Sequence, residues 1–280
     1  MKRNSSTNVT RIIVGFAVVT VLGLAMYFIG NQIGSAQGIS DDVKAGEIPA
    51  QGRDGDDCSR TGTSVRLPAT KLYIEHNATA EDTGIHGLFD GVDWVKLCVY
   101  DPRGRQVLEV EPERQLRTQS LSGFFFEAAE PPNIIVPIEE FLRRFPAGLY
   151  SVRGRAKDGR RLTGAATFTH DIPAAPVVTF PLDGTVVSPN GFTVTWNHVT
   201  TTLDGDPINR TAYEVIVIKD VPDDPNGFSR PNLDIHVPPS QTSLFIPAEF
   251  LEPGTAYKLE VLVLEVSGNQ TIKEGFFTTQ

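Results

Sequence analysis

Two kinds of apolar pattern divide the chain. Residues 12–29 form an unbroken apolar run without charge, whereas short runs with apolar residues at alternate positions recur from about residue 65 onward. A helix needs about 20 residues to cross a bilayer, and the apolar core of a signal peptide is usually shorter than this run. We therefore predict that residues 12–30 are either an uncleaved signal anchor or a signal peptide.

The charges beside this run predict its orientation. The first 30 residues carry only Lys2, Arg3 and Arg11, and all three precede the run. Because positive charges stay inside, residues 1–11 are predicted as a cytoplasmic tail and the body lies outside the cytoplasm. The body is membrane-anchored if the segment is uncleaved, and secreted if cleavage occurs among the small residues near Ala36.

Residues 31–64 are rich in Gly, Ser, Asp and Gln and contain few apolar residues. This composition is typical of a flexible linker. The acidic stretch within it, residues 52–57, lacks the alternating ligands and distal Glu of a calcium loop.

Residues 65–173 are predicted to be the first folded domain. Short strand patterns are separated by Gly, Asp, Asn and Pro turns, which favours an antiparallel β-sandwich over alternating strands and helices. The predicted strands are 71–76, 85–89, 94–100, 106–110, 123–127, 149–156 and 162–169. One short helix is predicted at residues 138–145, where apolar residues are spaced i, i+3, i+4 and i+7 between two prolines.

Residues 174–280 are predicted to be a second antiparallel β domain, which makes the chain mainly β with two sandwiches in tandem. The predicted strands are 192–196, 213–219, 234–237, 243–246, 256–266 and 271–278. Two of them, 213–219 and 256–266, have a period of two, and the second has a rather apolar outer face.

The second domain resembles the fibronectin type III family. The resemblance is carried by Thr193-Val-Thr-Trp196, by Tyr213-Glu-Val-Ile-Val, and by Leu251-Glu-Pro-Gly-Thr-Ala-Tyr257. It implies that Trp196 lies in the core, and that Tyr257 closes a corner after the Pro253-Gly254 turn by bonding to upstream backbone. Such modules mostly bind, space or present, so the resemblance implies no reaction.

The first domain resembles uncharacterised bacterial exported proteins that pair such a region with a fibronectin type III-like domain. The strings that carry this resemblance are Glu75-His-Asn-Ala-Thr, Asp82-Thr-Gly and Asp101-Pro-Arg-Gly. The resemblance brings no established activity.

Charge and motif content limit the classes of function that the sequence predicts. Beyond residue 30 the chain has 22 basic against 34 acidic residues, a net charge of −12, which provides no electrostatic footprint for nucleic acid. The five histidines are scattered, and nucleophile elbows, phosphate loops and dinucleotide motifs are absent from the sequence. The sequence therefore predicts a protein that is not an enzyme and that needs no cofactor.

A dense polar segment offers weak metal candidates. Its oxygen-bearing residues are Glu75, Asn77, Asp82 and Asp90, which suit calcium, while nearby His76 and His86 suit zinc. The alternative is ordinary turn chemistry, because Asn and Asp side chains bond to nearby backbone. The sequence leaves both interpretations open, and we expect no metal.

Export permits a disulfide, and the two cysteines are Cys58 and Cys98. Alternation along residues 94–100 predicts Trp94, Lys96 and Cys98 on one face, away from the deepest core, so the pair can form a bond or remain two thiols.

A further hypothesis is that Trp94, Tyr100 and the three phenylalanines 124–126 form a face for sugars or proteins.

These observations favour an exported, membrane-tethered, non-enzymatic binding or structural protein of the cell envelope. It would be held in the membrane through residues 12–30 and would present two sandwiches to a protein or polysaccharide partner. The alternative is a carbohydrate-binding accessory protein or, with less support, a carbohydrate-active enzyme, which would need two facing carboxylates in a cleft.

Overall fold

A computed structural model describes residues 58, 62–220 and 230–280. The predicted tail, apolar run and most of the linker lie outside these described residues. Within the described part, no helix has the length and apolar character needed to cross a membrane.

The second domain consists of two sheets that face each other. Strands β8 (Val178–Phe180), β10 (Phe192–Trp196) and β13 (Ser243–Ile246) form one sheet. On the other side, β9 (Thr185–Val187), β11 (Arg210–Lys219), β12 (Asn232–Val237), β14 (Ala256–Glu265) and β15 (Gln270–Thr279) lie in the order β9-β15-β14-β11-β12. Their inward side chains, Trp196 and Tyr213 among them, enclose one apolar core.

The predicted tyrosine corner is confirmed. The backbone N–H of Glu252 donates to the Tyr257 hydroxyl oxygen at 2.8 Å, and that hydroxyl donates to the Phe250 carbonyl at 3.4 Å. Gly254 has a φ of 62°, a left-handed conformation that glycine adopts without strain. This corner and the strand order give the second domain a fibronectin type III-like fold.

The first domain is built round one long strand. Its strands are β1 (Ser64–Arg66), β2 (Ala69–Asn77), β3 (Asp82–Tyr100), β4 (Gln106–Val110), β5 (Leu121–Glu127), β6 (Gly148–Ala156) and β7 (Arg161–Phe168). The first half of β3 pairs with β2 and β5, and its second half pairs with β4 and β6. The two strands predicted at 85–89 and 94–100 are therefore one continuous strand of 19 residues.

An irregularity in β3 changes the predicted faces. The pairing of β3 shifts register between Asp90 and Trp94 and again between Trp94 and Lys96, and each shift rotates the following side chains. Trp94 consequently lies in the core with Leu97 and Val99, fully buried, rather than on the face of Lys96. The prediction that placed Trp94 away from the core was wrong because strict alternation fails at a bulge.

Five strands of each domain follow the same pairing pattern. In the first domain, β1 lies parallel to β7, which is followed by antiparallel β6, β3 and β4. In the second domain, β9 lies parallel to β15, which is followed by antiparallel β14, β11 and β12. The Tyr150 hydroxyl, at the start of β6, donates to the Pro146 carbonyl at 3.1 Å, as Tyr257 does at the start of β14.

The structure has two short α-helices in the first domain. Helix α2 (Ile138–Arg144) is one residue shorter than predicted, and it buries Phe141 against the core. Helix α1 (Arg114–Gln119) was not predicted, because it buries no residue and so has no apolar stripe to reveal it.

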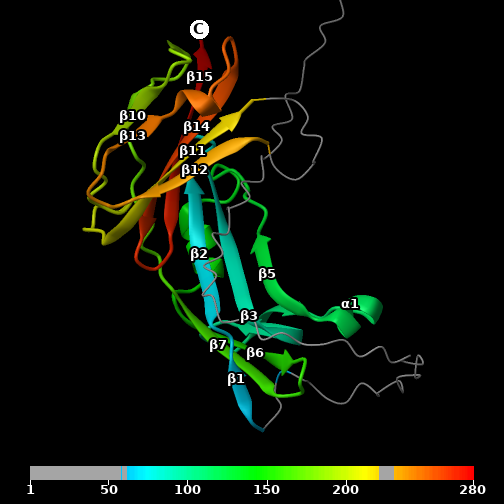
Figure 1. Cartoon of the computed structure of the whole chain (residues 1–280). Helices are drawn as coiled ribbons and strands as arrows, with labels where there is room; N and C mark the ends of the chain where they lie inside the picture. Colours follow the sequence, from blue (N-terminus) through cyan, green and yellow to red (C-terminus); the bar gives the residue numbers. More distant parts are fainter. Residues whose placement is uncertain (1–57, 59–61, 221–229) are drawn as a thin grey trace, which may run out of the picture.

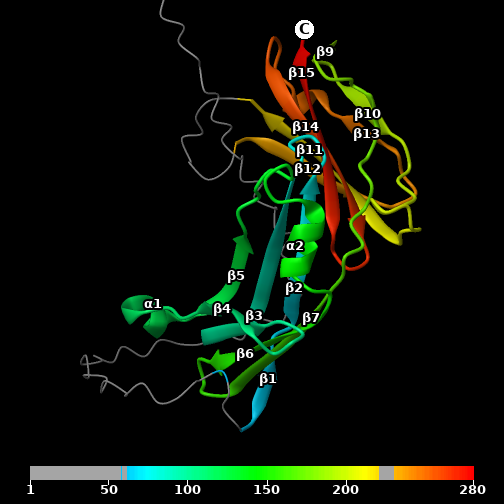
Figure 2. The same cartoon turned by 180° about the vertical axis from the view of Figure 1, so that it is seen from behind.

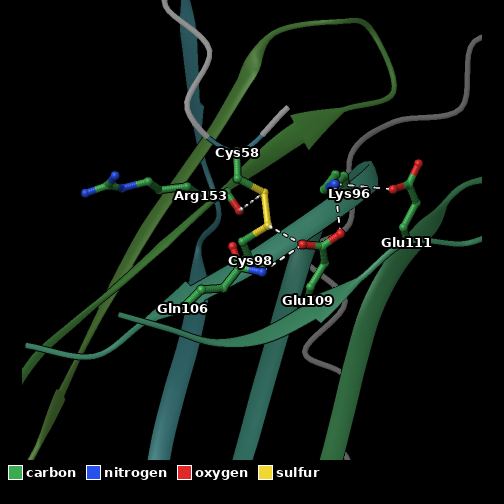
Figure 3. Close-up of a disulfide and its surroundings, with 7 residues drawn as sticks. All are labelled: Cys58, Lys96, Cys98, Gln106, Glu109, Glu111 and Arg153. Atoms are coloured by element: carbon green, nitrogen blue, oxygen red, sulfur yellow. Dashed lines mark hydrogen bonds and ion pairs between the residues drawn. A yellow bond between two sulfur atoms is a disulfide. The ribbon is translucent and has the colours of Figure 1, made fainter. Parts of the chain in front are cut away.

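A disulfide joins Cys58 to Cys98, with 6.2 Å between the two Cα atoms (Figure 3). Cys98 is fully buried, but it lies outside the apolar core cluster, on the face of Lys96 beside Glu109, as predicted. Beside it, the Lys96 ammonium lies 2.8 Å from one Glu109 oxygen and 3.3 Å from Glu111 (Figure 3). The bond attaches residue 58 to the C-terminal end of the domain's longest strand.

One sheet runs through both domains. Strand β2 of the first domain pairs with β15 of the second, so that the sheet order is β1-β7-β6-β3-β2-β15-β14-β11-β12. Figures 1 and 2 show β2 and β3 reaching up to the strands of the second domain, with β1 and the C-terminus at opposite ends of the molecule. The domains are thus joined by backbone hydrogen bonds as well as by the chain between them.

Candidate functional site at the domain junction

The edge of β15 is shared between two partners. Its first residues, Gln270 to Ile272, pair in parallel with Glu75 to Asn77 of β2, and its last residues, Phe277 to Thr279, pair with β9. An edge strand presents a row of unpaired backbone groups. Here β2 and β9 each pair with part of this edge, and β2 of the first domain pairs with the part nearest the β14–β15 turn.

Asn269 links this turn to two segments of the first domain. Its Oδ1 accepts a hydrogen bond from the Ile74 N–H at 2.8 Å, and its Nδ2 donates to the Thr169 carbonyl and hydroxyl at 3.2 and 3.0 Å. The same Nδ2 lies 3.3 Å from the Asp171 carbonyl. Because Asn269 is 0 % exposed, its amide is satisfied by the other domain and by the start of the connecting segment.

Further polar contacts extend along the junction. The Thr271 hydroxyl donates to the Pro173 carbonyl at 2.6 Å, and the Asn77 amide donates to Glu274 at 3.0 Å. The Glu274 N–H in turn donates to the Thr79 hydroxyl at 2.8 Å. Each bond joins residues of different domains or of the connecting segment, so the relative position of the domains is specified by directional contacts.

An acid–histidine cluster lies directly beside these contacts. Its members are Glu75 on β2, His86 on β3, Glu130 in the segment after β5, and Gln270 on β15. The His86 ring is 2 % exposed; its Nε2 lies 3.1 Å from Glu130 Oε1, and its Nδ1 lies 3.8 Å from Glu75 Oε2. The Gln270 amide donates to the same Glu75 oxygen, which brings the second domain into the cluster.

Local structure explains why Glu130 reaches His86. The backbone after β5 is fixed by a bond from the Ala128 N–H to the Ile85 carbonyl at 3.0 Å. Glu130 then lies over Gly84, where an added Cβ would be only 2.5 Å from Glu130 Oε1. Glycine at position 84 therefore leaves the space that the Glu130 carboxylate occupies.

Burial sets the electrostatics of this cluster. Desolvation raises the pKa of Glu75 to about 7 against the lowering effect of His86, and desolvation together with Asp82 raises the pKa of Glu130 to about 7. Desolvation also raises the pKa of Glu127, which stands opposite His86 on β5. The site therefore favours a bound proton or cation over three free carboxylate charges.

A second polar group lies on the same sheet face in the second domain. Lys258 lies 2.7 Å from Glu260 and 2.5 Å from Glu274, and both acids are on the face opposite the core. Glu214 is 0 % exposed, and its carboxylate lies 3.3 Å from Nε2 of the half-exposed His236. Desolvation raises the pKa of Glu260 despite its contact with Lys258.

Of the four predicted calcium candidates, the structure places only Glu75 in a group of three possible ligands. Oδ1 of the Asn77 side chain accepts hydrogen bonds from the Thr79 and Ala80 N–H groups at 2.9 and 3.0 Å, which is ordinary turn chemistry. Asp82 and Asp90 belong to neither of the acid–histidine groups found among the described residues. The calcium hypothesis gains no support from this arrangement.

The zinc and aromatic hypotheses have different outcomes. His86 joins the cluster, whereas Nδ1 of His76 lies 3.0 Å from the Thr83 hydroxyl, outside the cluster. Phe124 and Phe126 pack on the apolar core, while Phe125 lies on the opposite face against His86 at 6.0 Å between ring centres. One of the three phenylalanines points away from the core, as predicted, but with Trp94 buried they form no common aromatic face.

Three residues of the site were not predicted: Glu130, Asn269 and Gln270. Asn269 and Gln270 stand 195 positions from Ile74 and Glu75, so no local pattern connects them. The sequence carries no local signal for Asn269, because it follows Ser267-Gly268 in a turn, where Asn is common.

Comparisons with known proteins return only distant structural likenesses. No family model matches the chain, and no curated protein matches it. Among solved structures, the FN1–FN3 domains of chicken CNTN1 are 13% identical, with 78% of this chain and 68% of that chain covered and a TM-score of 0.32. The two-domain fibronectin type III segment of chicken tenascin is 14% identical, with 75% and 99% covered and a TM-score of 0.28.

A single domain gives a similar result. The third fibronectin III domain of human KIAA0343 protein is 21% identical, with 40% of this chain and 87% of that chain covered and a TM-score of 0.29. Scores at this level carry no argument about function. The fibronectin type III-like fold of the second domain rests on its own strand order and tyrosine corner.

Proposed function

We propose that the chain is an exported, membrane-tethered, non-enzymatic binding or structural protein of the cell envelope. The observation that carries this proposal is the sheet that continues from β2 into β15, reinforced by the buried contacts of Asn269. Two domains joined in this way move together, as suits a spacer or a presenting module. The proposal extends to the first domain as a divergent sandwich related to the second, because five strands of each follow one pairing pattern.

Two features support export. Disulfides persist in oxidising compartments, and Cys58 is bonded to Cys98. In addition, positive charges flank residues 12–29 only on the N-terminal side. Membrane attachment through residues 12–30 is the part of the proposal that rests on sequence alone.

Burial supports the non-enzymatic part. Glu75 and His86 are each less than a tenth exposed, so a substrate has no direct access to them. Glycosidases need two carboxylates that face each other across a cleft, whereas the junction carboxylates face a histidine and a glutamine inside the protein. A protein partner is preferred to a polysaccharide because Trp94 lies in the core and cannot stack on a sugar.

The surface best placed for a partner is the end opposite β1, which we name the tip patch. It consists of Leu182, Val186 and Phe276, which are 62 %, 59 % and 49 % exposed. The three lie together because the Phe276 N–H donates to Asp183 at 2.8 Å and β9 pairs with the end of β15. The strands that carry the patch, β9 and the end of β15, lie at the opposite end of the molecule from β1 (Figure 2).

Affinity capture from native membranes tests this proposal. The full chain is used as bait beside a triple variant in which all three tip-patch residues become serine. The control is Leu149→Ser, which removes a similarly exposed leucine from β6. The proposal expects one protein partner to be recovered with the full chain and the control but lost with the triple variant. Recovery of no specific partner, or hydrolysis of an envelope polysaccharide by the purified chain, would overturn it.

A further inference from the structure

Within the described residues, two groups of three acids and histidines have their ligand atoms within 4.8 Å of one another. One contains Glu214 and His236, but that histidine is half exposed and lies on an edge strand. The other consists of Glu75, His86 and Glu130, and its histidine is almost completely buried. Only the second group is enclosed enough to hold an ion away from water.

The protonation pattern of His86 leaves one nitrogen free. When Glu130 is ionised it can only accept, and the ring proton is then on Nε2, which lies 3.1 Å from it. Nδ1 then holds a lone pair, is buried, and has no hydrogen-bond partner. Its distance of 3.8 Å from Glu75 Oε2 exceeds hydrogen-bond length. A buried lone pair that faces a carboxylate at this distance is unfavourable unless a proton or a cation lies between the two groups.

We propose that Nδ1 of His86 and the Glu75 carboxylate bind a divalent transition-metal ion, with Zn²⁺ as the best-matched ion, while Glu130 accepts the Nε2 proton and holds the ring in place. Zinc ligands lie about 2.0–2.2 Å from the ion, so two tetrahedral ligands are roughly 3.3 Å apart. The 3.8 Å between Nδ1 and Glu75 Oε2 is close to that separation, and a small rotation of the imidazole admits the ion between them. Mixed imidazole and carboxylate ligands suit zinc better than calcium, which prefers oxygen alone.

The surroundings of the site fit a bound cation. Glu127 Oε2 is buried without a hydrogen-bond partner, and Glu127 pairs with His86 across β3 and β5, so this carboxylate or a water can complete the shell. The Gln270 amide holds Glu75 from the second domain. An ion here would therefore stabilise the junction itself, since its ligand Glu75 belongs to the strand that pairs with β15.

Thermal unfolding of the purified full chain tests this inference. The protein is stripped with a chelator and then titrated with ZnCl₂, with CaCl₂ and MgCl₂ in parallel. Free zinc at 100 times its Kd is expected to raise the Tm by about 5–10 °C, whereas calcium and magnesium are expected to have little effect. Elemental analysis of the dialysed complex should give one zinc per chain, and cobalt in its place should give visible bands typical of tetrahedral nitrogen and oxygen ligands.

Three variants assign the ion to these residues. Glu130→Gln keeps an oxygen that can accept from Nε2 but lacks the charge, so it should weaken zinc binding about 10–100-fold, whereas His86→Ala removes the ligand nitrogen and should abolish the zinc response. His198→Ala is the matched control, because this exposed histidine lies outside both groups, and it should respond like the unmodified chain.

The inference is overturned if zinc leaves the Tm unchanged, or if the response persists in His86→Ala. It is also overturned if the stripped chain gains stability only when the pH is lowered, which would mean that the cluster holds protons instead of metal. Because none of these measurements involves a partner, their failure is distinguishable from failure of the proposed binding function.

Discussion

Replacing Asn269 with alanine is the most direct test of the junction. The side chain makes four contacts: it accepts from the Ile74 N–H, and its Nδ2 faces the Thr169 carbonyl and hydroxyl and the Asp171 carbonyl, at 2.8 to 3.3 Å. Alanine removes all four and leaves a buried N–H without a partner. The backbone of the turn is unaffected, so the change acts mainly on the link between domains.

The expected cost follows from these contacts. A hydrogen bond contributes about 0.5–1.5 kcal/mol net, and a buried donor left unpaired costs about 1–3 kcal/mol. Nδ2 has only two protons for three acceptors, so we count three bonds, and the expected loss is about 2–4 kcal/mol. For a protein of this size that corresponds to a fall in Tm of roughly 4–16 °C.

Chemical denaturation followed by fluorescence measures the free energy of unfolding, and the exposed amide of Gln241→Ala serves as the control. Asn269→Asp sharpens the test, because a carboxylate can still accept from Ile74 but repels the carbonyl oxygens of Thr169 and Asp171. We expect it to be at least as destabilising as alanine. A loss below 0.5 kcal/mol for both variants, about the scatter of ordinary surface substitutions, would refute the account.

Three further predictions concern the individual domains. Replacing both Cys58 and Cys98 with alanine should lower the free energy of unfolding by about 2–4 kcal/mol, because the bond closes a loop across a separation of 40 residues, and adding reductant to the double variant should then change nothing. Tyr257→Phe and Tyr150→Phe should each cost about 1 kcal/mol in denaturant titrations, and equal costs would support a corner in both domains. Burial opposes the ionisation of Asp101, but hydrogen bonds from the arginines that follow it hold its pKa below 3.8. The stabilisation that this carboxylate provides is therefore present above that pH and is lost as the pH falls through the folded-state pKa. Asp101→Asn should therefore reduce stability at pH 7 and flatten the acid limb of a pH titration, and an unchanged limb would contradict this assignment.

The second domain could be predicted from sequence because its signals are local. Alternation along residues 213–219 predicted a strand, whose Tyr213 and Val215 lie in the core, and the Leu251–Tyr257 string predicted a corner whose bonds span only a few residues. Each of these inferences needs a strand and its nearest turn, and nothing more distant. Periodicity therefore carried the first inference, and the resemblance to the fibronectin type III family carried the second.

The first domain was predicted less well because strand β3 pairs with one set of strands over its first half and with another set over its second half. Alternation assumes an uninterrupted pleat, and the register shifts between Asp90 and Lys96 break it. Trp94 moved into the core as a result, and the aromatic surface expected around it is not formed. The bulge has a weak signature, Gly91 with a φ of 143°, that is clear only once the pairing is known.

The junction was beyond sequence reasoning for a different physical cause. A polar residue on a strand predicts exposure, because water is its usual partner. Glu75, His86 and Gln270 break that rule, since their partners come from elements far apart in the chain. Local rules fail where a site is assembled from distant segments. The residues that contradict the pattern are therefore the ones that indicate the site.

The polar character of the junction also bears on how rigid the molecule is. Apolar surfaces slide over one another with little change in free energy, whereas a buried amide is satisfied in few positions. A shift of β2 along β15 by one residue would turn Glu75 to the opposite face and separate it from Gln270. The same shift would remove the acceptor for the Ile74 N–H. The alignment of the two domains is therefore selected by the cost of leaving these groups unpaired, and an ion bound to Glu75 would add to that cost.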